Sequence, residues 1–546
     1  MSTGTSDQDA LQTESRIPIQ PLYRPADVAG KEYEAVLGDP GAFPFTRGAR
    51  PAGTRRGWIH RELSGEGDPR RSNEQFKYLL GLGQMGLDVI GDTATMGLLD
   101  PDHPFARHAV GTQGVSICCL DDFRELYREI PLDRVSLSHS LPAIFTVAGL
   151  YALALERGVS PANMRGSVIQ SPFFCEDCGY AVHMPFALRL RLAADAIEFS
   201  AREMPKFHTF LEDTYYISEN GIDAVEEMAL GFIEVRGLIR ELLARGLDID
   251  SFGPRIAILV NCRMDFFEEV AKIRATRRLF ARMMRDEFGA KDPRSWAVNI
   301  SVHTSGLSLT AQQPVNNIVR GAVQALAMAC AGVQALEVST FDEAFRTPSP
   351  EAHIVGLRTQ QVVELESRVT QVADPMGGSY YVESLTDEIE SRISEMIGRI
   401  EGMGDMAKLA DSGFFRRMFD EATERHSRAL IDGTLPKVGV NVHAVADEED
   451  TLLREVAERK FEPSRERIEW MAAYRAGRDA RAVEQALRGL YEAALDTSQS
   501  LMPAVIAGTR AGATNGEMAG VLRMAYGRPA DPFGVLSDPI AVTASA

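Results

Sequence analysis

Long apolar runs and a disulfide framework are both missing from this chain. Six cysteines in 546 residues are too few to hold so long a chain together by disulfides. No run of about 18 apolar residues could span a membrane. The polar start, MSTGTSDQDALQTES, is unlike a signal peptide. These absences predict a soluble protein of a reducing compartment, the cytoplasm.

Positive charge is also in short supply. Lys and Arg number 58 against 77 Asp and Glu, a formal net charge of −19. Nucleic acids and anionic membranes would be repelled by such a surface, so neither is expected as a partner. A small anionic ligand stays possible where a few arginines are concentrated.

One C-x-x-C spacing, Cys175 and Cys178 in FFCEDCGY, raises the question of zinc or redox chemistry. A zinc site normally needs two further ligands at recognisable spacing. The other four cysteines form no second such pair, and only His183 could serve as a third ligand. The motif is also unlike a thioredoxin-type one, which opens a helix after a strand. We interpret both cysteines as packing or pocket lining, and predict no metal site.

Short apolar or alternating runs recur along the chain, with amphipathic helical stretches between them. The runs are 87–93, 135–140, 167–171, 207–217, 255–261, 296–304, 335–340 and 369–375. Eight strands alternating with helices predict an α/β fold, a (β/α)₈ TIM barrel over residues 46–383. A doubly wound open sheet is the alternative, but no glycine-rich phosphate loop accompanies it. Residues 1–45 are expected to form an extended arm and residues 384–546 a helical C-terminal region.

Functional residues of such a barrel should lie where the strands end. Polar residues at these places are Asp92, Ser138, Ser140, Gln170, Tyr215, Tyr216, Glu219, His303, Ser339 and Asp374. The period of two in VSLSHS also places Ser136, Ser138 and Ser140 on one face. If these serines face the barrel axis, they leave space there and line it with hydroxyl groups. The alternative is that they face the surrounding helices.

Several blocks, in this order, carry a family resemblance: SNEQFKYLLGLGQMGLDV, DFFEEVAKIRATRRLFARM, HTSGLSLTAQQPVNNIVR, STFDEAF, RTQQVVELES, ADPMGGSYYVE and GVNVH. From about residue 45 to about residue 530 the chain resembles the large subunit of adenosylcobalamin-dependent acyl-CoA mutases. These are the methylmalonyl-, isobutyryl- and 2-hydroxyisobutyryl-CoA mutases. The resemblance implies a barrel with CoA threaded along its axis and a radical 1,2-rearrangement of the acyl group.

The family's cobalamin-binding D-x-H-x-x-G motif does not occur in this chain. The resemblance therefore implies that adenosylcobalamin is bound mainly by a separate small subunit, in an α2β2 heterotetramer. The N-terminal arm would suit contact with that partner.

The resemblance also assigns roles to individual residues. It places Glu219, Glu343 and Ser339 at the cofactor, the two glutamates holding the adenosyl ribose. It gives CoA and substrate contacts to Arg56, Arg61, Arg255, Ser138, Ser140, His303 and Gln334. It puts Tyr216, Gln170, Leu63, Gly179 and Tyr180 at the reacting acyl group. Without the motif context, each glutamate or arginine could equally be a surface charge.

Departures from the family pattern point to a changed acyl pocket. RELSG places Leu63 where the family has an aromatic residue, which opens space for a branched or substituted acyl chain. The position of the arginine that binds the methylmalonyl carboxylate falls at Gly179 or Tyr180. A carboxylate buried there unpaired would cost several kcal/mol. The sequence therefore predicts a branched, hydroxylated or bulky acyl-CoA and not methylmalonyl-CoA, unless Arg55 or His139 replaces the missing base.

A further departure concerns the thioester. Tyr216 stands in place of the family histidine that hydrogen-bonds the thioester carbonyl; a phenol can donate that bond but cannot become a cation. His303 could compensate, while Asn299 and Ser301 replace an arginine and a histidine of the family. These losses leave a second hypothesis open, a non-catalytic or regulatory barrel that binds CoA or a cobalamin partner.

Overall fold

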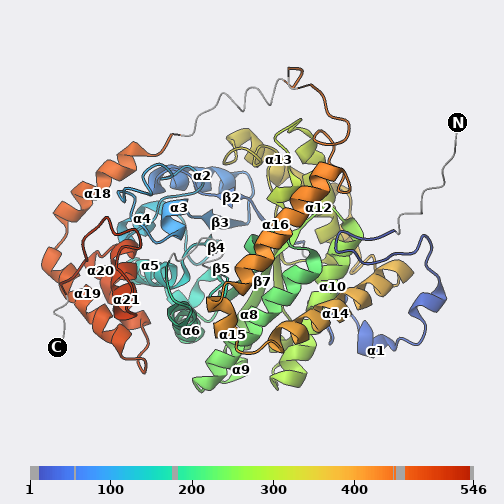
Figure 1. The fold of residues 1–546 in the computed structure, drawn as a ribbon, viewed down its shortest axis with the longest axis horizontal. Coiled ribbons are helices and arrows are strands. Elements are labelled where there is room, and N and C mark those ends of the chain that lie inside the picture. The colour runs from blue at the N-terminus through green and yellow to red at the C-terminus, as the bar shows by residue number, and fades with distance from the viewer. Residues whose placement is uncertain (1–10, 54–56, 175–182, 447, 451–461, 542–546) are drawn as a thin grey trace.

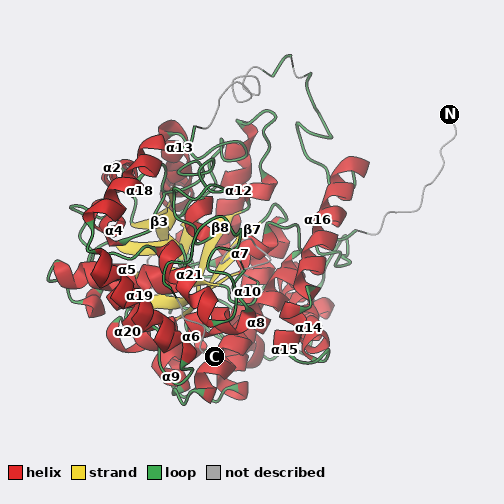
Figure 2. Ribbon diagram, turned by 60° about the vertical axis from the view of Figure 1, so that its left-hand side comes forward, coloured by secondary structure: helices red, strands yellow, loops and turns green. Residues whose placement is uncertain are grey.

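A nearly closed barrel of parallel strands forms the centre of the computed structural model, which describes residues 11–53, 57–174, 183–446, 448–450 and 462–541. Within these residues the strand order is β1-β9-β8-β7-β6-β5-β4-β3-β2. Since only Glu62 separates β1 from β2, the two edges of the sheet meet, and the predicted barrel is confirmed. Figure 2 shows the strands at the centre, surrounded by helices. The strands are β1 (Ile59–Arg61), β2 (Leu63–Ser64), β3 (Gly86–Ile90), β4 (Ser136–Ser140), β5 (Arg165–Gln170), β6 (Phe207–Asp213), β7 (Ile256–Cys262), β8 (Asn299–Thr304) and β9 (Ala335–Glu337).

One predicted strand is wrong, and one strand pair was not predicted. Residues 369–375 form no strand but the short helix η7 (Val369–Gln371) and a turn, in which Asp374 has a φ of 47°. The missing strand pair lies earlier, at IHRELS. Its charged residues hide the alternation because they are buried against partners: Gln360 Nε2, for example, donates to Glu62 Oε1 over 2.9 Å.

Side chains alternate between two environments along the strands, as the period of two requires. Outward residues such as Leu137, Val168 and Ile258 pack against the surrounding helices. Inward residues include the small apolar cluster of Ile169, Leu211, Ala257 and Leu259. Ser138 faces inward as well, because its Oγ lies 2.7 Å from Ser167 Oγ across neighbouring strands. The serine face therefore lines the axis.

Helices surround the barrel and continue after it. The main ones up to β9 are α2 (Pro69–Gly81), α4 (Leu120–Leu126), α5 (Ala143–Glu156), α6 (Phe186–Glu203), α7 (Thr214–Ser218), α8 (Ala224–Ala244), α10 (Phe266–Arg282) and α12 (Asn316–Ala331). Those after β9 are α13 (Pro350–Gln361), α14 (Tyr380–Glu401), α15 (Met406–Asp411), α16 (Phe414–Asp432), α18 (Arg465–Gly477), α19 (Ala480–Leu495), α20 (Met502–Ala511) and α21 (Asn515–Ala525). None of the described helices is long and apolar enough to cross a membrane.

Helix α10 carries an unusual set of buried cations. Lys272 is fully buried and lies 2.8 Å from Glu227 of α8 and 2.6 Å from Glu269. Its Nζ also donates to the carbonyl of Asn261 at the end of β7. Buried charges are tolerated only when paired in this way. The triad thereby fixes the end of β7, where the site begins.

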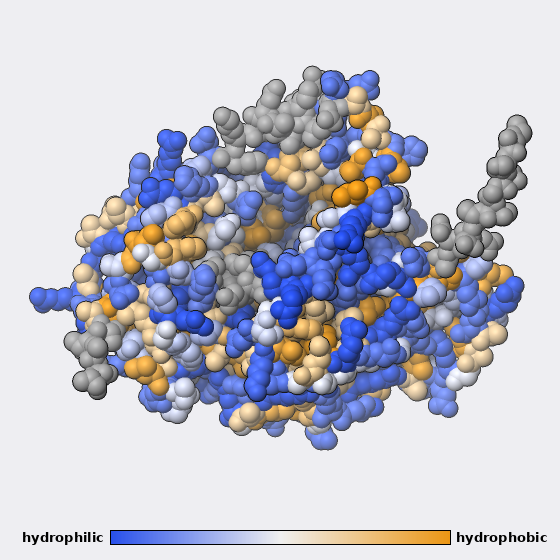
Figure 3. Space-filling view, in the orientation of Figure 1, coloured by the Kyte–Doolittle hydropathy of each residue, from blue (hydrophilic) through white to orange (hydrophobic). Residues whose placement is uncertain are grey.

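Helix α16 lies over the carboxyl ends of β5 to β7. The rings of Phe174 and Phe415 meet edge to face with centroids 4.9 Å apart, and Thr423 Oγ1 donates to the carbonyl of Asn220. Figure 1 shows α16 crossing in front of the barrel. Figure 3 shows hydrophilic side chains over this helix and a hollow beside it. The carboxyl end of the barrel is thus a recessed opening.

The segments near both ends of the described chain pack against the barrel helices. In the arm, Ser15 N donates to Glu268 Oε2 over 3.0 Å and Arg16 pairs with Asp223 at 2.6 Å. On the other side, α18–α21 pack near α4, α5 and α6 (Figure 1). There, Arg191 donates to the carbonyls of Ala493, Ala494, Asp496 and Gln499.

Candidate active site

The carboxyl end of the barrel holds a glutamate that accepts three hydrogen bonds. Glu219 follows the short helix α7 after β6. Its Oε1 accepts from Asn261 Nδ2 and from Ser305 Oγ, each over 2.7 Å, and its Oε2 accepts from Leu307 N over 2.8 Å. A carboxylate offers about four acceptor sites. One acceptor direction is therefore left for a ligand.

A second glutamate, Glu343, lies on the turn after β9. Thr340 N donates to its Oε2 over 2.6 Å, and its Oε1 is 3.7 Å from His303 Nε2. Burial raises the pKa of Glu343 to about 8, so near neutral pH this carboxyl can donate as well as accept. Ser339 Oγ joins the group, 3.0 Å from His303 Nε2. The predicted cofactor residues Glu219, Glu343 and Ser339 are thus at one end of the barrel.

Aromatic rings form the floor of this opening. The ring of His303 stacks on Tyr215 with centroids 4.3 Å apart and planes 10° apart. Burial lowers the pKa of His303 to about 3, so its imidazole is neutral. Tyr216 is half-buried beside Tyr215, with ring centroids 5.5 Å apart. Tyr215 therefore contacts both the residue expected to replace the family histidine, Tyr216, and the one expected to compensate for it, His303.

The axis below is lined by hydroxyls and one guanidinium. Arg61 points inward from β1, and its Nη2 donates to Ser136 Oγ over 3.0 Å. Ser138 contacts Ser167, and Ser140 ends the same strand, 7% exposed. Arg61 is only 5% exposed; it belongs to the axis, not to the surface.

Two acids inside the barrel were missed in the sequence. Asp88 on β3 and Glu337 on β9 are buried, and β3 pairs in register so that Asp88 lies between Leu63 and Ser138. Burial is the main cause of a pKa for Glu337 well above the usual range, with the Asp88 and Glu343 carboxyls adding to it. The signal was an acid between apolar residues in each of two runs, Asp88 in LDVIGDT and Glu337 in ALEVST. An acid inside a barrel strand must face either a partner or the axis.

The amino end of the barrel holds other predicted residues. Gln334 precedes β9, and its Oε1 accepts from Ile300 N over 2.7 Å. A cavity of about 270 Å³ adjoins it, lined also by Arg47, Arg50 and Trp58. Arg255 precedes β7 at this same end of the strands. Arginines therefore gather at the end opposite Glu219 and Glu343.

Some predicted residues lie elsewhere or outside the description. Gln170 ends β5 in register with Glu212 and lines a cavity beside α5 and α6. Its Nε2 is buried with no hydrogen-bond partner among the described residues. His139 faces outward, with Tyr127 Oη 2.5 Å from its Nε2, which removes it as a base for a carboxylated substrate. The residues outside the described part of the chain are Arg55, Arg56, Cys175, Cys178, Gly179 and Tyr180.

Two other cysteines and an aspartate have a geometry that could hold a metal ion. Cys118, Cys119 and Asp122 present ligand atoms within 4.8 Å of one another, all buried. However, Arg467 Nη2 donates to Asp122 Oδ2 over 2.5 Å and to Cys118 Sγ over 3.1 Å. A guanidinium already neutralises the carboxylate. The cluster thus anchors α18 to the barrel.

The opening at the carboxyl end fits the ribose of an adenosyl group. Gly306 lies between two of its walls: a Cβ there would come 3.2 Å from Glu219 Oε2 and 3.6 Å from Tyr215 Oη. The missing side chain leaves room beside a carboxylate that has a spare acceptor direction. Glu219, Glu343 and Ser339 supply the acceptors that a ribose diol needs.

Comparison with known proteins shows the family to which this chain belongs. The Methylmalonyl-CoA mutase family model matches residues 12–528. The 2-hydroxyisobutanoyl-CoA mutase large subunit of Aquincola tertiaricarbonis is 34% identical over 524 residues, 95% of this chain and 92% of that protein. Methylmalonyl-CoA mutase of Escherichia coli (strain K12) is 34% identical over 530 residues, 96% and 73% of the two chains. The mitochondrial enzyme of Homo sapiens is 32% identical over 529 residues, 96% and 70%. The chain therefore belongs to the methylmalonyl-CoA mutase family of isomerases.

Proposed function

We propose that this chain is the large, catalytic subunit of an adenosylcobalamin-dependent mutase for a branched, hydroxylated or bulky acyl-CoA other than methylmalonyl-CoA. The observation that carries the proposal is the hydroxyl-lined axis between two unlike ends. Arg47, Arg50 and Gln334 line a cavity at the amino end, suited to phosphates and polar groups of CoA. Glu219 and Glu343 lie at the other end, suited to an adenosyl ribose.

When bound, adenosylcobalamin supplies the radical that begins a 1,2-rearrangement of the carbon skeleton; this hard chemistry belongs to the cofactor. The chain's contribution is to bind and orient. Glu219 is held rigidly by three donors, so it needs little reorganisation to accept from a ribose hydroxyl. Glu343, with its raised pKa, can serve as donor or acceptor at the second hydroxyl.

The groups around the acyl end are neutral or hydrogen-bonded, which suits a reaction that must exclude water. His303 is neutral and rests on Tyr215. Tyr216 is the side chain we assign to the thioester carbonyl, with His303, which stacks on Tyr215, as an alternative donor. A phenol or neutral imidazole positions the carbonyl without placing a full charge in the pocket.

Specificity for the acyl group rests on Leu63 and on the missing arginine. Leu63 lies level with Asp88 and Ser138 in the sheet, and an aliphatic side chain there leaves more room than an aromatic ring. A methylmalonyl carboxylate would lie next to the buried acids Asp88 and Glu337. An ionised acid would repel this carboxylate, and otherwise the acid would have to stay protonated. The name of the Aquincola relative agrees with a hydroxylated substrate, while methylmalonyl-CoA mutases are equally similar.

The same proposal includes a partner. The Aquincola relative is named a large subunit, and this chain lacks the D-x-H-x-x-G motif. We infer that a separate small subunit carries cobalamin, that the two assemble as an α2β2 heterotetramer in the cytoplasm, and that the N-terminal arm contributes to the contact.

A substrate panel tests the proposal. The chain is mixed with its cognate cobalamin subunit and adenosylcobalamin, and given branched, hydroxylated, aryl-substituted and dicarboxylic acyl-CoAs. Isomers are followed by mass spectrometry. Turnover of a branched or hydroxylated acyl-CoA, with methylmalonyl-CoA left unchanged, is the expected result. If none of the acyl-CoAs is converted although cobalamin is bound, the result would favour the non-catalytic barrel instead.

A further inference from the structure

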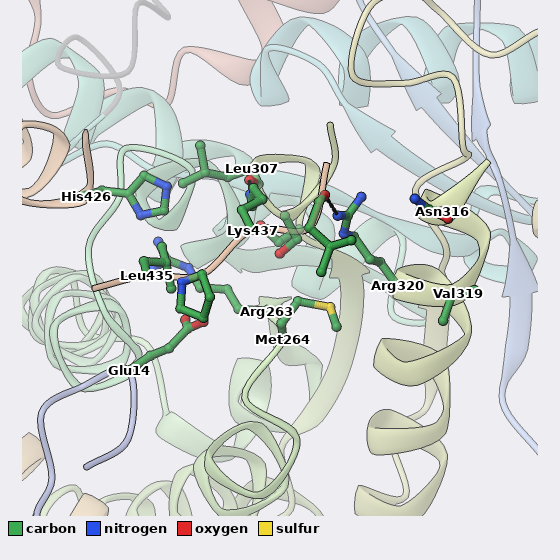
Figure 4. A pocket seen from close by; sticks show the side chains of 14 residues that line it. Glu14, Arg263, Met264, Leu307, Asn316, Val319, Arg320, His426, Leu435 and Lys437 are labelled. Atoms are coloured by element: carbon green, nitrogen blue, oxygen red, sulfur yellow. Dashed lines mark hydrogen bonds between the residues drawn. The ribbon is translucent and has the colours of Figure 1, made fainter. Parts of the chain in front are cut away.

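A cavity of about 370 Å³ lies behind the loop that holds Glu219, away from the barrel axis. Five segments far apart in the sequence form its walls: the N-terminal arm, the loops after β7 and β8, helix α12, and α16 with the turn that follows it. Its lining residues are Glu14, Arg263, Met264, Ser305, Leu307, Ser308, Asn316, Val319, Arg320, His426, Leu435, Pro436, Lys437 and Val438. Figure 4 shows this cavity with the cations on several sides of it.

Three cations line this cavity, and none has an ion pair within the described residues. Arg263 Nη2 donates to the carbonyl of Ser218 over 2.8 Å, Lys437 Nζ to that of Leu307 over 2.7 Å, and Arg320 Nη2 to that of Val438 over 2.8 Å. Carbonyls satisfy the geometry of these donors but not their charge. Like charges gathered in a partly buried cavity repel one another, so an anion that joins them there is stabilised.

Other buried cations of the protein follow two patterns. Lys272 has two carboxylate partners, and the buried Arg274 pairs with Asp374 and with Glu383. Arg277 is also buried, and it donates to the carbonyl of Gly332 over 2.8 Å. Around Arg263, Arg320 and Lys437 the lining residues include one carboxyl, that of Glu14.

Further polar atoms in the cavity have no partner. Arg263 Nε and His426 Nε2 are both buried with no hydrogen-bond partner in the described part of the chain. Buried polar atoms are nearly always paired, so each unpaired one calls for a partner that the chain does not provide. The remaining wall is apolar, formed by Met264, Leu307, Val319 and Leu435. The lining thus combines a cationic end with an apolar side.

One acid, Glu14, reaches this cavity from the N-terminal arm (Figure 4). Burial raises its pKa, while Arg263 and Lys437 act to lower it. The three cations also interact with one another: burial, with the Arg320 and Arg263 charges, lowers the pKa of Lys437 to about 8, while Glu14 and Glu219 act to raise it. Among the lining residues, three cations face the one carboxyl of Glu14.

We propose that this cavity binds a small organic oxyanion, its phosphate or carboxylate head on Arg263 and Lys437 and its apolar body against Met264 and Leu435. Glu14 holds the place of that anion in the free chain. The site is separate from the CoA cavity, which lies at the other end of the strands. It goes beyond the proposed mutase activity and does not depend on it.

The site is coupled to Glu219 through one residue. Leu307 donates its N–H to Glu219 Oε2, and its carbonyl accepts from Lys437. An anion that draws Lys437 toward itself weakens its bond to Leu307 and loosens one of the three donors that hold Glu219. Occupancy of the cavity therefore acts on the adenosyl end of the active site.

Calorimetric titration of the full chain tests the proposal, at constant ionic strength in chloride buffer. The probes are inorganic phosphate, glycerol 3-phosphate and butyrate, which separate a bare phosphate, an organic phosphate and an organic carboxylate. We expect saturable binding of one organic probe at a single site. Arg263→Gln and Lys437→Met should each weaken it by at least about tenfold, because each removes a charge-assisted bond.

Two further variants make the result decisive. Glu14→Gln should tighten binding by about threefold or more, since it removes a competing negative charge. Arg294→Gln is the matched control, because Arg294 is exposed and pairs with Asp292, and it should leave binding unchanged. No saturable binding of any probe up to about 10 mM, equal affinity in Arg263→Gln, or weaker binding in Glu14→Gln would overturn the proposal.

Discussion

Replacing Glu219 by glutamine distinguishes a rigid ribose acceptor from an ordinary buried carboxylate. The carboxylate accepts from Asn261, Ser305 and Leu307. A carboxamide has only one acceptor oxygen. If that oxygen faces Asn261 and Ser305, its NH₂ group faces the N–H of Leu307, and two donors oppose each other. One buried unsatisfied donor costs about 1–3 kcal/mol, which is about 5- to 150-fold in a binding constant.

Glutamine at position 343 is the matched comparison. Glu343 accepts one bond, from Thr340 N, and its raised pKa means that it is largely protonated near neutral pH. A carboxamide imitates that protonated state. Glu343→Gln should therefore change the affinity by less than about threefold, although the two substitutions are chemically identical.

The assay is a titration of the assembled enzyme with adenosylcobalamin and, separately, with hydroxocobalamin, which lacks the adenosyl ribose. Glu219→Gln should weaken binding of adenosylcobalamin alone. Equal losses for both cobalamins, or equal effects of Glu219→Gln and Glu343→Gln, would refute the reasoning.

Other predictions can be checked on the same protein. Lys272→Met leaves Glu227 and Glu269 buried without their cation and should destabilise the fold by about 3–5 kcal/mol, a fall of a few °C in melting temperature for a chain of this size; the exposed Lys291→Met should melt like the wild type. Leu63→Tyr should lower kcat/KM for a branched acyl-CoA by about tenfold or more through steric crowding, and unchanged kinetics would remove Leu63 from the acyl pocket. Because the pKa of Glu343 is raised to about 8 in the fold from its ordinary value of 4.5, the stability it contributes is complete below pH 4.5 and is lost as pH rises through 8. The melting temperature should then fall between pH 6 and 9 by more in the wild type than in Glu343→Gln, and identical slopes would contradict this assignment.

The barrel could be predicted because its strands and helices have different periods. Seven of the eight expected strands are present, since buried strands such as RIAILVN keep an apolar or alternating pattern over their whole length. IHRELS was overlooked because His60, Arg61 and Glu62 disguise a strand whose charges all find partners. The run at 369–375 imitated a strand, but Asp374 there turns the chain and pairs with Arg47 and Arg274.

The site was only partly accessible to the same reasoning. Glu219, Glu343 and Ser339 were found through motif context, and the structure places them at one end of the barrel. Asp88 and Glu337 were visible as acids between apolar residues of two strands, yet only the strand register shows that they line the axis. The cavity of Arg263, Arg320 and Lys437 could not be predicted, because its walls come from five separate segments of the chain and no sequence pattern joins them.

The central claim is that the acyl pocket accepts a branched or hydroxylated chain and rejects a free carboxylate. Direct competition tests it: the assembled enzyme receives equal amounts of 2-hydroxyisobutyryl-CoA and methylmalonyl-CoA, and the ratio of the two kcat/KM values is read from the isomers formed. Burying an unpaired carboxylate costs several kcal/mol, so the account predicts a ratio of at least about 100 in favour of the hydroxylated substrate. A ratio near one, or a preference for methylmalonyl-CoA, would contradict it.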